Sequence, residues 1–196
     1  MILFGASGHG KSIIDIAQSI GEPITHIYDD NPPAQSVCNI RVYKFDPRAV
    51  HPNEKWIIGI GNNMVRKAVK SRLNVKFGTL IHISASISKW ATLGEGSVVM
   101  AQVVINASAN VGSHCIINSS SVVEHDCKLG DFVHISPNAT IAGGVEIGEG
   151  SHIGIGACVL PYISIGKWAT IGAGAVIIKN VPDGAVVVGN PGRIIK

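Results

Sequence analysis

The second half of the chain carries an aliphatic residue at every sixth position. From Ile81 to Ile177, an Ile, Leu or Val occupies each of 17 successive positions in this register, and a small or medium-sized residue follows four positions later in nearly every unit. A helix cannot hold such a stripe on one face, because six steps of 100° fall ~120° short of two turns. The period therefore predicts a parallel β-solenoid. Three hexapeptides form each 18-residue coil, and the aliphatic side chains stack inside.

Residues 1–80 follow a different pattern, in which short apolar runs alternate with glycine-rich or acidic turns. We expect strands at 2–4, 24–28 and 56–60, and helices from 13 to 20 and from 64 to 73. This order predicts an α/β domain with a Rossmann-like βαβ sheet, which binds ligands at the carboxyl ends of its strands. Residues 31–55 give no clear pattern and are expected to form a loop with at most one strand, at 40–42. The boundary is predicted between a domain at 1–80 and a solenoid domain at 81–196.

The composition excludes several classes of protein. Charged residues make up 15% of the chain and mean hydropathy is +0.32, yet no run approaches the ~18 apolar residues of a membrane span. The start lacks the basic and apolar regions of a secretory signal, so we expect a cytoplasmic protein. The net charge of +3 is spread along the chain, which argues against a nucleic-acid partner. The four cysteines lack metal-binding spacing and suit a reducing compartment.

The segment Gly5–Ser12, GASGHGKS, satisfies the expression for a phosphate-binding loop of ATPases. We favour a nucleotide-sugar loop, because only about 80 residues precede the solenoid and an ATPase needs a larger sheet with a separate metal-binding Asp. ATP hydrolysis and a purely structural helix start are the alternatives. Either ligand would use the same chemistry, backbone N–H groups at a helix N-terminus facing a phosphate.

The candidate chemistry lies at His125 and Asp126, which occupy outward positions of their hexapeptide. Gly143 stands three hexapeptides beyond His125 and should therefore lie one coil away. This pairing suits acyl transfer, since a base accepts the proton of the nucleophile and a backbone N–H stabilises the oxyanion. An outward His-Asp pair is also compatible with simple solvation, but the flanking segment 118–126 is unusually polar.

The remaining histidines and cysteines indicate neither a metal site nor a thiol nucleophile. His134 and His152 are one coil length apart and should stack on adjacent coils. No two of the solenoid's histidines are two coil lengths apart, which is the spacing of zinc-bearing β-helix carbonic anhydrases. Cys115 and Cys127 occupy inward corner positions, as small buried residues do. We therefore predict no metal.

The hexapeptides LGEGSV at 93–98 and IGEGSH at 147–152 resemble those of hexapeptide-repeat acyltransferases. That resemblance implies a left-handed β-helix and homotrimers acting on acetyl-CoA or acyl-carrier thioesters. Together with GASGHG at 5–10, Asp29-Asp30, the segment 119–127 and the GNP at 189–191, the whole chain resembles the PglD-type nucleotide-sugar N-acetyltransferases of the bacillosamine pathway. It is similar, less closely, to sialic acid O-acetyltransferases and perosamine N-acetyltransferases.

This resemblance implies roles for individual residues. His125 would be the general base, Asp126 would raise its basicity in place of the family's glutamate, and Gly143 would supply the oxyanion N–H. On the cofactor side the resemblance implies His134, Ile155 and Ala173, the last departing from an expected glycine. The residues implied for the UDP-sugar are Ser7, Gly8, His9, Asp29, Asp30, Gly61 and Asn118.

The expected reaction is direct transfer of an acetyl group from acetyl-CoA to the 4-amino group of a UDP-linked 4-amino-4,6-dideoxy sugar. The active sites would lie between the subunits of a homotrimer. Acetylation of a GDP- or dTDP-linked amino sugar, O-acetylation of sialic acid, and a non-catalytic nucleotide-sugar sensor are the alternatives. Both His125 and Asp126 are present, which favours an enzyme over a sensor.

Overall fold

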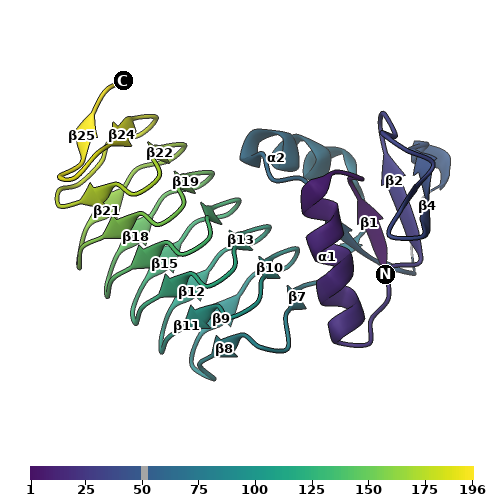
Figure 1. The fold of residues 1–196 in the computed structure, drawn as a ribbon, viewed down its shortest axis with the longest axis horizontal. Helices are drawn as coiled ribbons and strands as arrows, with labels where there is room; N and C mark the ends of the chain where they lie inside the picture. Colours follow the sequence, from purple (N-terminus) through teal and green to yellow (C-terminus); the bar gives the residue numbers. More distant parts are fainter. Residues whose placement is uncertain (50–52) are drawn as a thin grey trace.

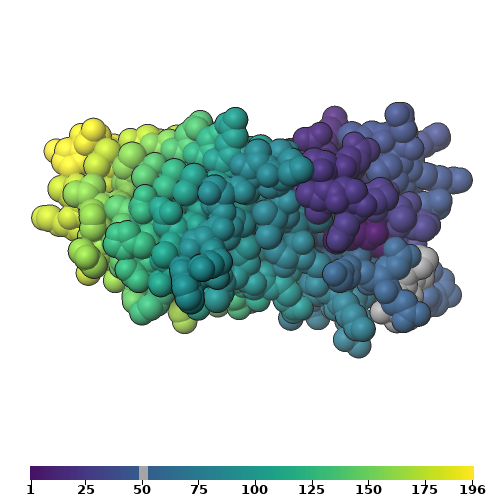
Figure 2. Space-filling model, turned by 90° about the horizontal axis from the view of Figure 1, so that it is seen from below, coloured from purple at the N-terminus to yellow at the C-terminus, as the bar shows by residue number. Residues whose placement is uncertain are grey.

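A computed structural model describes residues 1–49 and 53–196. The chain forms an N-terminal parallel sheet flanked by two helices, followed by a long β-solenoid that ends at the C-terminus (Figure 1). The molecule is elongated, with the N-terminal sheet at one end and the last coils of the solenoid at the other (Figure 2). None of the helices in the described residues has both the length and the apolar character of a membrane span.

The N-terminal sheet has the strand order β3-β4-β2-β1-β5-β6. Strand β1 lies between β2 and β5 and pairs with both in parallel, as the βαβ pattern predicted. The strands are β1 (Ile2–Phe4), β2 (His26–Asp29), β3 (Ser36–Val37), β4 (Ile40–Lys44), β5 (Lys55–Ile58) and β6 (Lys76–Phe77), and the helices are α1 (Gly8–Ser19), the 3-10 helix η1 (Pro47–Ala49) and α2 (Asn63–Arg72). Strand β1 is fully buried because helices and strands cover both its faces.

The segment 31–55 has more structure than its sequence indicated. Strands β3 and β4 form an antiparallel hairpin, and β4 joins the main sheet beside β2. Cys38 and Asn39 connect the two strands, both with positive φ (48° and 63°), as in a tight two-residue hairpin turn. Asn39 was the one local signal for this turn. The part of the segment at 50–52 lies outside the described residues.

The solenoid has three faces, each a parallel sheet of two-residue strands. The first face contains β7 (Leu80–Ile81), β10 (Val98–Val99), β13 (Ile116–Ile117), β16 (His134–Ile135), β19 (His152–Ile153), β22 (Thr170–Ile171) and β24 (Val186–Val188), with β25 (Arg193–Ile194) added antiparallel. The second contains β8 (Ser86–Ile87), β11 (Val104–Ile105), β14 (Val122–Val123), β17 (Thr140–Ile141), β20 (Cys158–Val159) and β23 (Val176–Ile177). The third contains β9 (Thr92–Leu93), β12 (Asn110–Val111), β15 (Lys128–Leu129), β18 (Glu146–Ile147) and β21 (Ser164–Ile165).

From β7 to β23, each strand pairs with the equivalent strand of the next coil, three hexapeptides further on, which confirms the coil length predicted from the period. The last coil is two residues shorter, since Thr170 lies opposite Val186. The second residue of each strand is the aliphatic one, and it is buried throughout the central coils. The small residues four positions on are also internal, including Cys115 and Cys127 at 0% exposure. Only the first coil departs from this pattern, since Ile81 is 36% exposed where no coil lies beneath it.

The three corners between the faces share a backbone feature that the sequence period did not indicate. At most corners one residue takes a positive φ, and these residues recur every sixth position, from Gly96 through Asp126 and Gly144 to Gly174. Glycine, Asn and Asp adopt this conformation most easily, but here Tyr162 (φ 59°) also occupies it. Successive side chains at one corner therefore stack along the solenoid axis.

Helix α1 lies between the N-terminal sheet and the solenoid, whereas α2 packs on the other face of the sheet and extends toward the solenoid (Figure 1). Helix α1 contacts β7, and its buried side chains form one apolar cluster with the solenoid core. The outward residues of the first three strands of the first face, Leu80, Val98 and Ile116, are at most 1% exposed as a result. Further along the same face, His134, His152 and Thr170 line a hollow beside α2.

Candidate functional site

His125 and Asp126 lie at the corner that joins the second and third faces. Both side chains point outward, with 55% and 66% of their surface exposed, as predicted. The Nδ1 atom of His125 lies 2.8 Å from Asp126 Oδ2, so the carboxylate accepts the Nδ1 proton and leaves Nε2 unprotonated in the neutral ring. The pair therefore presents a proton acceptor at Nε2.

Gly143 lies under the His125 ring, one coil further on. A methyl group at position 143 would stand 2.6 Å from His125 Cε1 and 2.7 Å from Nε2, so only glycine leaves room for the imidazole. The N–H of Gly144 donates to the His125 carbonyl (2.9 Å), whereas the N–H of Gly143 has no acceptor among the described residues. The one-coil spacing therefore places Gly143 against the His125 ring, and a proton acceptor next to a backbone N–H without an acceptor is an arrangement suited to acyl transfer.

A second group of predicted residues assembles around His134 on the first face. The Nδ2 of Asn118 lies 3.2 Å from His134 Nε2, and His134 also contacts the backbone of Gly61. His9, the second residue of α1, lies near enough for its charge to lower the pKa of His134, and its buried Nε2 has no partner within the described chain. Gly61 and His134 line a cavity of about 550 Å³ together with Asn62, Asn63, Met64, Gly150, His152, Trp168 and Thr170.

The histidines of this cavity are held in the neutral state. His134 and His152 stack with their ring centroids 4.8 Å apart, as their spacing predicted. Burial, and then the charges of His152 and Arg66, lower the pKa of His134 to about 3. Burial and Arg66 likewise lower the pKa of His9 to about 4. These neutral rings can accept or donate hydrogen bonds to a ligand without the cost of burying a charge.

The acidic residues predicted at the strand ends have structural partners. Asp29 accepts hydrogen bonds from the backbone N–H of Ala6 and of Asn31, both at 2.8 Å, and so shapes the loop after β1. Asp30 forms an ion pair with Arg72 of α2. Ser7 occupies the N-cap position of α1, although its side chain makes no capping hydrogen bond in the described structure, and its Oγ lies 3.4 Å from the Gly59 carbonyl. The loop after β1 thus contacts Asp29 and Gly59, at the carboxyl ends of the neighbouring strands β2 and β5.

Ile155 and Ala173 lie one coil apart at the corner between the first and second faces, the same corner that carries Asn118. The Gly174 N–H donates to the Ile155 carbonyl at 2.8 Å, and Ile155 is 57% exposed. His125 and Gly143 lie at the next corner, across the width of the second face. A single chain therefore does not bring the two groups of predicted residues together.

Known protein families match both the N-terminal domain and the solenoid of this chain. Residues 1–73 match the PglD N-terminal domain, and residues 108–143 and 144–179 match the bacterial transferase hexapeptide (six repeats). The acetyltransferase domain of PglB from Neisseria gonorrhoeae is 37% identical and superposes with a TM-score of 0.93, with coverage of 99% of this chain and 98% of that one. The chain belongs to the PglD-type acyltransferase family.

Two further relatives of the PglD-type family are named for the sugars they act on. A perosamine N-acetyltransferase from Caulobacter crescentus, solved with CoA and GDP-perosamine, is 33% identical, with a TM-score of 0.94 and coverage of 100% of this chain and 96% of that one. A UDP-N-acetylbacillosamine N-acetyltransferase from Bacillus subtilis is 41% identical over 108 residues. That match spans 50% of this chain and 50% of the curated relative.

Two aromatic residues beside these groups escaped the sequence analysis. Tyr162 is 80% exposed and stands one coil after Gly144, so its ring covers that glycine next to His125. Trp168 holds the equivalent place over Gly150 beside the cavity. Both are the fourth residue of their hexapeptide, so a search of the sequence for aromatic residues at that position would have found them.

The phosphate-loop expression at Gly5–Ser12 does not correspond to a phosphate-binding loop of ATPases in this PglD-type chain. Helix α1 already begins at Gly8, so Gly8, His9 and Gly10 are helical rather than wrapped around a phosphate. We expect the wild-type chain to show no ATPase activity. Lys11→Ala should keep its rate of acyl transfer within a few-fold of wild type. A release assay for inorganic phosphate, run beside the transferase assay, tests this; ATP hydrolysis abolished by Lys11→Ala would contradict it.

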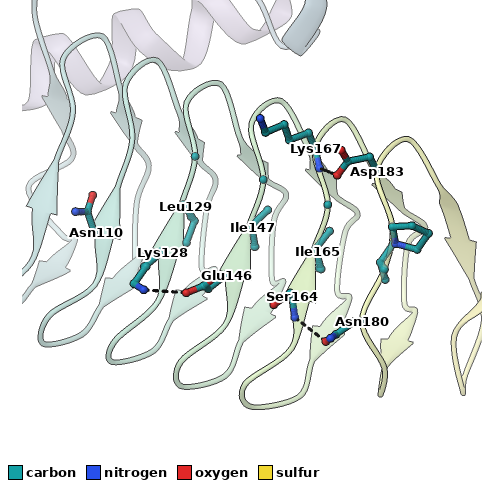
Figure 3. A pocket seen from close by; sticks show the side chains of 15 residues that line it. Asn110, Lys128, Leu129, Glu146, Ile147, Ser164, Ile165, Lys167, Asn180 and Asp183 are labelled. Atoms are coloured by element: carbon teal, nitrogen blue, oxygen red, sulfur yellow. Dashed lines mark hydrogen bonds and ion pairs between the residues drawn. The ribbon is translucent and has the colours of Figure 1, made fainter.

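A larger depression, of about 770 Å³, lies over the third face (Figure 3). Two pairs of its polar groups bond to each other, since Lys128 pairs with Glu146 (2.8 Å) and Asp183 accepts from the Lys167 N–H (2.7 Å). Among the residues the structure describes, no group of three or more His, Cys, Asp or Glu could hold a metal ion.

Proposed function

We propose that this chain transfers the acetyl group of acetyl-CoA to the amino group of a nucleotide-linked amino sugar. The observation that supports this proposal is that His125 Nε2 lies over Gly143 of the next coil. The relatives named above act on bacillosamine- and perosamine-type sugars, both of which offer an amine. Among these, we favour the 4-amino group of a UDP-linked 4-amino-4,6-dideoxy sugar.

In this mechanism the sugar amine attacks the thioester carbonyl carbon and the C–S bond breaks. His125 Nε2 takes the proton that the amine loses, and that proton passes to the departing CoA sulfur. Asp126 holds the ring in the tautomer with Nδ1 protonated and stabilises the imidazolium while it carries the extra proton. The free Gly143 N–H faces the oxyanion of the tetrahedral intermediate. No covalent enzyme intermediate is needed.

We further propose that three copies of the chain share these sites. The outward row of the second face bears no charge, and its residues are Ser86, Val104, Val122, Thr140, Cys158 and Val176. The first face is partly covered by α1, and the third carries the ion pair of Lys128 and Glu146. Packing second faces around a threefold axis would set the His125 corner of one copy beside the Asn118 corner of the next.

We expect light scattering to give about three times the 20.5 kDa chain mass. Val122→Glu places a charge in the middle of the uncharged row and should yield monomers with little activity. Thr92→Glu, on the third face, is the matched control and should leave the trimer intact. A wild-type chain that is monomeric at micromolar concentration would contradict the shared site.

The decisive experiment is a thiol-release assay with acetyl-CoA across UDP-, dTDP- and GDP-linked 4-amino sugars and sialic acid. We expect fastest release with a UDP-linked 4-amino sugar, and a product acetyl group that resists hydroxylamine because it is an amide. A GDP-linked sugar as the best acceptor would move the assignment to the perosamine type. A hydroxylamine-sensitive product would indicate an ester, and no release with any acceptor would favour a non-catalytic sensor.

A further inference from the structure

Arg66 lies at the junction of the two halves of the molecule and is only 1% exposed. It belongs to α2, and no carboxylate pairs with it within the described residues. Burying an unpaired charge is costly unless all its donors are satisfied. Its surroundings should therefore show what the charge does there.

All five N–H donors of Arg66 have acceptors, and these come from two separate parts of the fold. On the N-terminal side, Nη1 donates to the carbonyls of Ile60 (3.0 Å) and Gly61 (3.1 Å). On the solenoid side, Nε donates to the His114 carbonyl (2.8 Å) and Nη2 to the Phe132 carbonyl (2.9 Å). One rigid, planar group thus joins the loop after β5 to two successive coils.

Asn63, three residues earlier in α2, extends this junction. Its Oδ1 accepts from Arg66 Nη2 (2.8 Å), while its Nδ2 donates to the carbonyls of Gly150 (3.0 Å) and Ser151 (3.3 Å). His114, Phe132 and Gly150 occupy equivalent positions of successive coils, so the two side chains together hold three consecutive coils at one corner. The Gly61 loop is fixed there against the wall that carries His134.

We propose that Arg66 is a positioning residue that holds the Gly61 loop at a set height on the solenoid and so determines the affinity for the nucleotide part of the acceptor. This inference rests on the proposed function, because Gly61, one of the residues expected to hold the nucleotide sugar, lines the cavity. Arg66 bonds to Gly61 and Asn63, which line this cavity, and its charge behind them favours an anionic ligand, the diphosphate of the acceptor. The acetyl-transfer corner at His125 lies elsewhere and does not depend on Arg66.

The variant Arg66→Lys keeps the charge but carries three N–H donors without the planar fork, so it cannot reach both parts of the fold. We expect the KM for the nucleotide sugar to rise at least ten-fold, with the KM for acetyl-CoA unchanged within two-fold. Binding of UDP and GDP, measured by calorimetry, should weaken by a similar factor. Amide hydrogen exchange at 59–63 should accelerate while the coils keep their protection.

Lys67→Met is the matched control, because Lys67 lies in the same helix and bridges the same junction through an exposed ion pair with Glu149. It should leave both KM values and the exchange rates within two-fold of wild type. Asn63→Ala removes the uncharged side chain that joins α2 to the solenoid. We expect it to raise the KM for the nucleotide sugar a few-fold and to leave the KM for acetyl-CoA unchanged. This variant keeps the proposal testable if Arg66→Lys does not fold.

Wild-type KM values in Arg66→Lys, or an equal rise in both KM values, would overturn the proposal. Equal effects of Arg66→Lys and Lys67→Met would also overturn it. If acetyl transfer itself is not observed, nucleoside diphosphate binding and hydrogen exchange still test the role of Arg66. The proposed function and this inference can therefore fail separately.

Discussion

Replacing His125 by alanine is expected to lower kcat by about 10²–10⁴-fold, the usual contribution of a positioned general base. The KM for acetyl-CoA should change by no more than a few-fold, because the residues expected to border the cofactor lie at another corner. The His125 side chain is half-exposed and, within the described part of the chain, bonds to Asp126 alone, so the melting temperature should hardly move. Steady-state kinetics with the identified acceptor, together with a thermal melt, test this.

Asp126 acts through the imidazole, so its loss should be milder. We expect Asp126→Asn to lower kcat about ten-fold, and the double variant to be no worse than His125→Ala alone, because residues that act as a unit are not additive. His82→Ala removes a histidine from a different corner and serves as the control. Near-normal kcat in His125→Ala would refute the assignment of the base and direct attention to His134.

Acid is expected to destabilise the fold well above the pH at which carboxylates titrate. Burial lowers the pKa of His114 to about 4, from an ordinary value of about 6.5. Both ring nitrogens lack partners within the described chain, and the ring stacks on Phe132 with centroids 5.2 Å apart. The unfolded chain therefore binds a proton that the folded chain does not, so stability is complete above about pH 6.5 and falls as pH drops toward 4.

For His114, which is 1% exposed, the loss amounts to about 3 kcal/mol across this window, at about 1.36 kcal/mol per pKa unit. His9 and His134 add to it, since their pKa values are also lowered, to about 4 and about 3. Urea midpoints between pH 7.5 and 4.5 should fall steeply in wild type and less steeply in His114→Phe. Phenylalanine suits the position, because Phe132 adopts the same positive φ one coil away.

Phe77→Leu is the control for the acid prediction. Phe77 meets His114 edge to face with centroids 4.6 Å apart, so its loss weakens the same stack without removing a titrating group. It should lower the urea midpoint by a similar amount at every pH and leave the slope unchanged. Equal slopes in wild type and His114→Phe would show that other groups govern acid unfolding.

The sequence alone determined the features that depend on spacing along the chain. A six-residue period admits one backbone solution with buried aliphatic residues, so the coil length, the inward cysteines and the stacking of His134 on His152 all followed from counting. Gly143 could be placed beside His125 for the same reason, since three hexapeptides bring the chain back to the same corner. The βαβ order likewise followed from apolar runs and their turns.

Only the tertiary structure decided how the two halves meet, because contacts such as that of Arg66 with Phe132 follow no local rule. A basic residue in an amphipathic helix is expected to be exposed. Arg66 is buried because oxygens of the nearby Ile60, Gly61 and Asn63 and of two distant solenoid coils accept all five of its N–H groups. The same holds for Asp29, whose carboxylate turns inward to cap two backbone N–H groups. Hydrogen bonds between segments far apart in sequence depend on orientation in space, and a pattern of residue types does not encode that orientation.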